Sequence, residues 1–234
     1  QRGKFFCENA RSLLRGWGTS QSQEMMHPAT KERLPMIILV GLIVFFTSWD
    51  WIFGLESWMI VPREVTASFS EIRAGQVSWG AVSELLSCLG CAFLHGDFGH
   101  LVGNMLFFWI FGAVILELTG WRWLVVIFVT TSVGASIGQV MMDPESVIPA
   151  LGASGAVMGF EGAYLGMVVR RKRPDPHVWP MSHAIPPGHL AAIGVVGVFL
   201  DMQGIYGNTP DGIAYGAHVG GFVTGICVSF LRKD

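Results

Sequence analysis

Four polar side chains with the chemistry of acyl transfer lie within or at the ends of otherwise apolar stretches of the sequence: His100, Asn104, Ser154 and His218. A serine hydroxyl can attack a carbonyl carbon when a nearby imidazole accepts its proton. Backbone N–H groups, together with amide or imidazole donors, can then stabilise the oxyanion that forms. These residue types therefore raise the hypothesis of a hydrolase with a serine nucleophile.

Ser154 lies in the hexapeptide LGASGA, with Gly152 before it and Gly155 after it, at the start of an apolar run. Glycines let another backbone come close, and the first turn of a helix presents N–H groups that have no partner within the helix. Taken alone, this segment fits a small-residue packing patch between membrane helices better than it fits a nucleophile. The positions of the other polar residues reverse that preference.

The composition is that of a polytopic membrane protein. Of the 234 residues, 51% are hydrophobic and 14% are charged, whereas soluble domains average about 25% charged residues. The chain has 30 glycines and 9 tryptophans, which is typical of closely packed helices with aromatic residues at the membrane interfaces. A net charge of −2 gives no reason to expect a nucleic-acid partner.

Six apolar runs each have about the length of a membrane-spanning helix. They cover residues 35–54, 101–118, 123–142, 150–169, 188–206 and 212–231. Because lipid excludes unpaired backbone polar groups, we expect an all-α membrane protein built as a six-helix bundle. We expect residues 1–34 to form a cytoplasmic tail, residues 35–234 to form the membrane domain, and residues 55–94 to form an ordered loop partly in the interface.

The basic residues predict the orientation of the chain. With the N-terminus inside, thirteen of the fifteen lysines and arginines lie on the inner side, and the outer segments hold Arg63 and Arg73. This distribution obeys the positive-inside rule. We therefore expect both termini to be cytoplasmic in a multi-pass protein of the cell (inner) membrane. The basic run at residues 170–173 could also contact anionic membrane lipids.

This topology brings the four polar residues to one depth. The second span enters from the outer side near His100, with Asn104 one turn deeper on the same face. Ser154 lies about one turn into the fourth span, and His218 lies six residues into the sixth. At about 1.5 Å per residue, all four are roughly 0–10 Å below the outer ends of their helices.

A pairing of Ser154 with His218 follows from that common depth. Glycines on the fourth and sixth spans would let these helices approach closely and bring the imidazole to the hydroxyl. No acidic residue lies at this depth to orient His218, so we predict a catalytic dyad rather than a triad. We expect His100, Asn104 and the Ser154 N–H group to form the oxyanion hole.

Two other segments carry motif letters without the expected context. Residues 134–138 read G-A-S-I-G, but they lie inside the third span, not at a strand–turn–helix elbow, so we interpret them as helix packing. Cys88, Cys91 and His95 lack the further ligands that a zinc site needs. We expect no metal there, and the two cysteines are either free or bridged.

Three segments together resemble the signature motifs of the rhomboid intramembrane serine proteases. They are residues 92–105 (AFLHGDFGHLVGNM), 152–155 (GASG) and 216–222 (GAHVGGF). The resemblance implies a six-helix bundle with Ser154 as the nucleophile and His218 as the general base. It also implies that His100 and Asn104 join the oxyanion hole and that His95 helps to order the site.

The same resemblance implies what such a protein acts on. Rhomboid substrates are single-pass transmembrane proteins, cut in or near the membrane without a cofactor. The loop at residues 55–94 would be the family's membrane-embedded first loop, and the fifth span would be its lateral gate.

Two positions depart from the family pattern. Met158 stands where an aromatic residue often packs on the histidine, although a sulfur atom can also contact a ring. Glu161 lies inside the fourth span, where we expect an apolar residue, and a carboxyl group there should be neutral or hydrogen-bonded between helices.

Two alternative functions stay open. The first is a proteolytically inactive rhomboid-like protein that binds and remodels membrane clients. The second is a small transporter, which is disfavoured because the spans carry few charges beyond Glu161 and Asp201.

Overall fold

The computed structural model describes residues 28–170, 186–207 and 213–232. The helices are α2 (Pro28–Phe53), α3 (Pro62–Arg73), α4 (Trp79–Gly90), α5 (Phe98–Thr119), α6 (Trp121–Met142), α7 (Ser154–Arg170), α8 (Pro187–Gly207) and α9 (Tyr215–Leu231), with short 3₁₀ turns η1 (Glu56–Trp58) and η2 (Cys91–Phe93). The protein is an all-α membrane protein, as predicted. The six predicted spans correspond to α2 and α5 to α9, of which α2, α5 and α6 are long and apolar enough to cross a bilayer by the criteria applied.

Some sequence predictions concern residues outside the described part. These are the tail as far as residue 27, the inner segment 171–185 with most of its basic run, and the outer segment at residues 208–212. The chain divides into two units, Gln1–Leu34 and Pro35–Asp234. The second unit contains the helical bundle and the candidate site.

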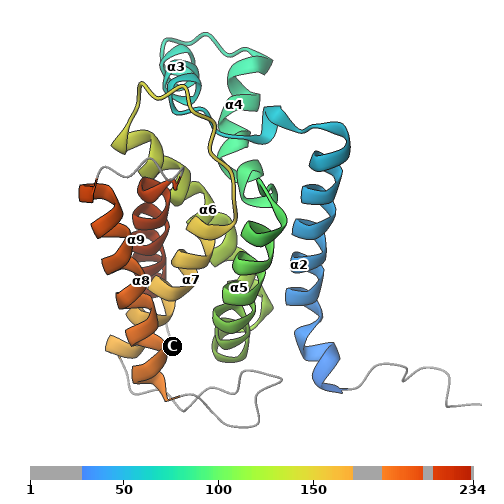
Figure 1. Ribbon diagram of the computed structural model, residues 1–234, viewed down its shortest axis with the longest axis vertical. Coiled ribbons are helices and arrows are strands. Elements are labelled where there is room, and N and C mark those ends of the chain that lie inside the picture. The colour runs from blue at the N-terminus through green and yellow to red at the C-terminus, as the bar shows by residue number, and fades with distance from the viewer. Residues whose placement is uncertain (1–27, 171–185, 208–212, 233–234) are drawn as a thin grey trace, which may run out of the picture. The chain divides into compact units, whose positions relative to one another are not determined.

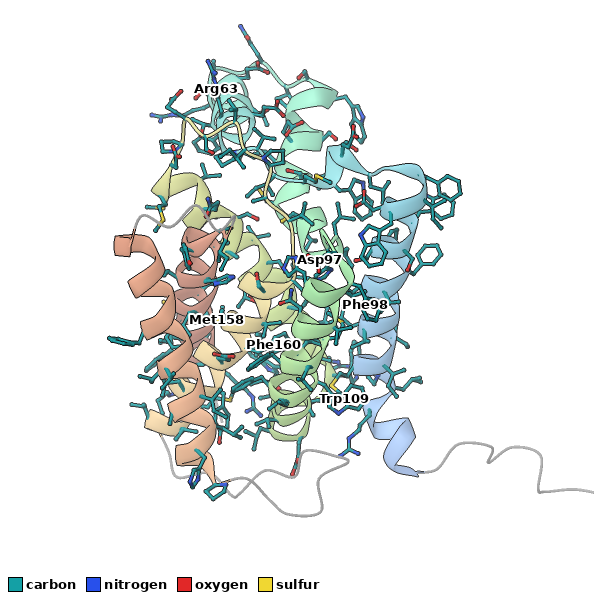
Figure 2. The ribbon with its side chains drawn as sticks, viewed as in Figure 1. Arg63, Asp97, Phe98, Trp109, Met158 and Phe160 are labelled. Atoms are coloured by element: carbon teal, nitrogen blue, oxygen red, sulfur yellow. The ribbon has the colours of Figure 1, made fainter. Side chains whose placement is uncertain are left out.

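Helix α7 is the central element of the bundle. It packs against α5, α6, α8 and α9, and Figure 1 shows it between α5 and the α8–α9 pair. Every residue from Gly155 to Tyr164 is buried. Lipid tails are as apolar as leucine, so close packing rather than water exclusion must hold such helices together. Phe160, labelled in Figure 2, illustrates this packing: its ring lies edge-on to Phe108 of α5, with centroids 5.1 Å apart.

The predicted glycine contact between the fourth and sixth spans is confirmed. On α7, Gly155 and Gly159 meet Gly221 and Gly225 of α9 so closely that a Cβ atom on either α9 glycine would overlap a carbonyl group of α7. Backbone atoms cannot move aside as a flexible side chain can, so these positions require glycine. The sequence therefore fixes the distance between α7 and α9.

The motif at residues 134–138 is a packing element, as predicted. Gly134 faces Thr224 of α9, and Gly138 meets the backbone of Gly216 and Gly220. Ser136 is 1% exposed, and its hydroxyl donates a hydrogen bond of 2.8 Å to the carbonyl oxygen of Cys88.

The loop at residues 55–94 consists largely of the helices α3 and α4. Gly75, at a φ of 82°, makes the turn between them. Ser78 caps α4 by accepting a hydrogen bond of 3.1 Å from the Ala81 N–H group. In the view of Figure 1, both helices lie above α5.

Several helices begin at other residues than predicted. Helix α2 begins at Pro28 rather than at residue 35, and α5 begins at Phe98 rather than at residue 101, whereas α7 and α9 begin later than predicted. Helix α7 begins at Ser154 and not near residue 150, because residues 150–153 form a non-helical segment, called here the strap. Ala150 exchanges two backbone hydrogen bonds of 2.8 and 3.0 Å with Ile60. Gly152 has a φ of 129°, which no helix accommodates. Helix α9 begins at Tyr215 and not at residue 212.

Candidate active site

Ser154 and His218 lie within hydrogen-bonding distance of each other. The Oγ atom of Ser154 is 2.9 Å from Nε2 of His218. Ser154 is the first residue of α7, and His218 lies one turn into α9. The glycine contact between these two helices is what brings the side chains together. In the tautomer with its proton on Nδ1, His218 accepts the hydroxyl proton at Nε2.

The strap turns sharply at Gly152 to deliver Ser154. The Gly152 N–H group donates a hydrogen bond of 2.9 Å to the carbonyl oxygen of Cys91. A Cβ atom at position 152 would lie 2.8 Å from Cε1 of His100, closer than real Cβ contacts come. Its positive φ and this close approach both require glycine. Gly152 therefore supports the site by shaping the backbone that presents Ser154.

His95 forms a hydrogen bond with the backbone of the strap. It is 0% exposed, and its Nε2 atom accepts a hydrogen bond of 3.3 Å from the Ala153 N–H group. Its Nδ1 atom therefore carries the proton and donates to Oγ1 of Thr47, 3.0 Å away. The Thr47 hydroxyl in turn donates to the carbonyl oxygen of Phe93. This chain fixes the tautomer of His95 and requires a neutral ring.

His95 lies in the connection between η2 and α5, and its environment disfavours a second proton. Burial, together with the nearby His100, lowers the pKa of His95 from 6.5 to about 3, although Asp97 opposes the shift. Between pH 6.5 and 3 the unfolded chain therefore binds a proton that the folded chain does not. The neutral His95 ring therefore contributes to the free energy of unfolding. This contribution is complete above pH 6.5 and is lost as the pH falls toward 3.

We expect this difference in proton binding between the folded and unfolded chains to make the stability depend on pH in acid. The stability of the purified protein in detergent should fall below pH 6.5 with a slope from His95 of up to about 1.4 kcal/mol per pH unit. His95→Gln, which keeps a donor and an acceptor but does not titrate, should be less stable at pH 7 and should lose this part of the slope. His189→Gln, at an exposed position on α8, is the control and should keep it. Equal slopes for wild type and His95→Gln would contradict the assignment.

The start of α5 contributes His100 and Asn104. Asp97 caps this helix by accepting a hydrogen bond of 2.9 Å from the His100 N–H group, and Figure 2 labels Asp97 there. One turn on, the Asn104 amide donates a hydrogen bond of 3.1 Å to the carbonyl oxygen of His100. The rings of His95 and His100 meet edge to face, with centroids 5.0 Å apart. The cap thus orients two donors on one face of α5.

A groove of about 820 Å³ connects these residues, with walls from α5, α7 and α8. Its lining includes all four polar residues that the sequence places at one depth: His100, Asn104, Ser154 and His218. Most of the remaining lining is apolar, for example Phe107, Val157 and Ile193. The groove can therefore accept an apolar chain beside a nucleophile.

Two residues beside the site, Tyr215 and Gln139, lie outside the motifs that predicted it. Tyr215 provides an aromatic neighbour of His218, with ring centroids 6.4 Å apart at 81°, whereas Met158 lies toward Gly197 of α8. Gln139 of α6 accepts a hydrogen bond of 3.2 Å from the Ala217 N–H group and so anchors the first turn of α9. The spacing of Tyr215, one turn before His218, could have indicated its contact.

The two cysteines of η2 and α4 are free thiols, which decides between the two alternatives left open by the sequence. Cys88 and Cys91 are both buried. Burial raises the pKa of the Cys91 thiol to about 12, although its hydrogen bond with Ser136 opposes the shift. Within the part of the chain that the structure describes, no group of three histidine, cysteine or acidic side chains could hold a metal ion.

Comparisons with known proteins show which family the chain resembles. A family model described as the rhomboid domain matches residues 82–233. The chain is 25% identical over 143 residues to RHOMBOID-like protein 5 of Arabidopsis thaliana, covering 61% of this chain and 42% of that protein. It is 26% identical over 162 residues to RHOMBOID-like protein 6, mitochondrial, of the same plant, covering 68% and 48%.

A fungal protein gives a similar match. The chain is 27% identical over 153 residues to Rhomboid protein 1, mitochondrial, of Saccharomyces cerevisiae, covering 62% of this chain and 41% of that protein. The chain matches less than half the length of each of these three curated relatives.

Proposed function

The chain belongs to the rhomboid family, and from this premise we propose that it is an intramembrane serine endopeptidase acting on single-pass transmembrane proteins. The observation that carries the proposal is the 2.9 Å separation of Ser154 Oγ from His218 Nε2 at one end of an apolar groove. An isolated serine hydroxyl is a poor nucleophile near neutral pH, so an imidazole at this distance supplies what the reaction requires.

The proposed reaction proceeds by acyl transfer. Ser154 Oγ attacks the scissile carbonyl carbon while His218 Nε2 takes the hydroxyl proton. His218 then returns this proton to the leaving amine, the C–N bond breaks, and an ester to Ser154 remains. A water molecule, deprotonated by His218, hydrolyses the ester and regenerates both side chains. No cofactor takes part in these steps.

The oxyanion would be stabilised from two helices. Ser154 is the first residue of α7, so its own N–H group and those of the next residues have no acceptor four residues earlier within the helix. The positive end of the helix dipole lies at the same place. Asn104 and His100 line the groove from α5 and can add side-chain donors.

We expect Asn104→Ala and His100→Ala each to lower kcat by about 10²–10³-fold, the usual loss for one oxyanion-hole donor. Turnover of a transmembrane substrate by each purified variant, with its melting temperature as a control for folding, checks this. Val102→Ala, on the exposed side of α5, should turn over like wild type. Wild-type rates in both variants and in the double variant would remove these residues from the mechanism.

A fluorophosphonate probe tests the proposed function directly. The purified chain should be labelled at Ser154, as mapped by mass spectrometry, and should cleave a single-pass substrate. A preparation that is folded and binds client proteins, yet is neither labelled nor active, would favour the inactive client-remodelling alternative. The reaction needs no partner beyond the substrate and the surrounding lipid.

We propose that both termini face the cytoplasm in the cell (inner) membrane, since thirteen of fifteen basic residues then lie inside. Two of the relatives are named as mitochondrial, and those names describe those proteins alone. Reporter fusions at either end should report the inner side. A terminus on the outer side would overturn both this orientation and the common depth inferred for the four site residues.

A further inference from the structure

An acidic side chain lies in the apolar part of the groove, and no step of the proposed reaction uses it. Glu161 is 4% exposed and lines the groove together with Ser154, Val157 and Met158 of the same helix. Val157, Met158 and Glu161 follow Ser154 by three, four and seven residues, so all four side chains lie on one face of α7. Figure 2 labels Met158 on α7. Glu161 is therefore two turns, about 10 Å, farther along α7 than Ser154.

The wall opposite Glu161 is α8, which makes room for the carboxyl group with two glycines. A Cβ atom at Gly194 would lie 3.3 Å from Oε2 of Glu161, and one at Gly197 would lie 3.6 Å from it. The neighbouring lining residues of α8, Ile193 and Val196, are hydrocarbon. A carboxyl group at membrane depth is costly and usually functional. Here it borders the cavity that a substrate would occupy.

We propose that Glu161 determines specificity by accepting a hydrogen bond from a substrate side chain, an amide or a hydroxyl, on the membrane-deep side of the scissile bond. The inference rests on the proposed protease function. An extended chain advances about 3.3 Å per residue, so the residue beside Glu161 is about three residues from the bond held at Ser154.

The chemistry of the groove supports this preference. A donor side chain that leaves water for an apolar groove loses its hydrogen bonds, and that loss disfavours binding unless the wall supplies an acceptor. A carboxyl group accepts a hydrogen bond whether or not it is protonated. The groove would therefore favour glutamine, asparagine, serine or threonine at this substrate position over leucine.

Matched substrates test the proposal. Each is a single-pass protein with either glutamine or leucine at one position, two, three or four residues from the cleaved bond on the membrane-deep side. We expect wild type to cleave the glutamine substrate with a kcat/KM at least about tenfold higher at one of these positions. Glu161→Met should bring this ratio to one or below, and Glu161→Gln, whose amide carbonyl still accepts a hydrogen bond, should keep most of it.

Glu117→Met is the matched control, because it removes an exposed carboxylate from α5 outside the residues that line the groove. It should keep the wild-type ratio. A ratio that survives in Glu161→Met, or a wild-type ratio near one at all three positions, overturns the proposal. The wild-type ratio of kcat/KM for the glutamine and leucine substrates can overturn the proposal even if Glu161→Met fails to fold. Failure of the protease function is distinct: wild type would then cleave no substrate and Ser154 would not be labelled, and both proposals would fall.

Discussion

Ser154→Ala is expected to abolish substrate cleavage and fluorophosphonate labelling while leaving the fold intact. The substitution removes one oxygen atom at the first residue of α7, so the packing of α7 against α9 should be unchanged. Loss of the nucleophile in a serine protease lowers kcat by about 10⁶-fold. His218→Ala should be as severe, because the hydroxyl then has no base to take its proton. The measurements are cleavage by the purified protein and its melting temperature.

Ser136→Ala is the matched control for this experiment. Ser136 is also a serine between glycines in an apolar helix, but its hydroxyl donates to the carbonyl oxygen of Cys88 and is 2.8 Å from it. The variant should keep both cleavage and labelling, with a loss of stability of about 1 kcal/mol from the hydrogen bond. If Ser154→Ala still cleaves a membrane substrate in a purified system, the mechanism proposed here is wrong.

Gly221→Ala is expected to have the second large effect, although it adds a single methyl group to a residue that takes no part in the reaction. That methyl group would overlap the carbonyl group of Gly155, so α9 must move away from α7. Overpacking of this kind costs about 1–3 kcal/mol. Because His218 is on the same helix, one turn earlier, its imidazole must shift relative to Ser154. A misplacement of about 1 Å can cost about 10²-fold in rate.

Gly41→Ala provides the comparison. Gly41 lies within α2, and a Cβ atom there would meet nothing within 4 Å. Alanine is the better helix former by up to about 1 kcal/mol, so this variant should be at least as stable as wild type and fully active. Thermal unfolding and cleavage rates of the two variants distinguish the cases. Equal behaviour would mean that the glycine contact does not set the geometry of the dyad.

The sequence by itself predicted α2 and the helices α5 to α9, the pairing of Ser154 with His218, and the close contact between the helices that carry them. The run of apolar residues predicts each span, because a bilayer demands a helix of about that length. The common depth of Ser154 and His218 follows from the helical rise alone. Glycines in two distant segments predict the close contact, and Gly155 and Gly221 now form it. Each of these inferences rests on the spacing of residues within individual helices.

What only the tertiary structure decided are the features that depend on contacts between distant segments. The start of α7 at Ser154 follows from the bridge between Ala150 and Ile60, which no local pattern reveals. The tautomer of His95 is set by the Ala153 N–H group of the strap, together with Thr47 of α2. An acidic residue at position 161 has no explanation in the sequence. In the structure Glu161 lines a groove whose opposite wall is α8. Periodicity reports the face on which a residue lies, whereas its function depends on which helix that face meets.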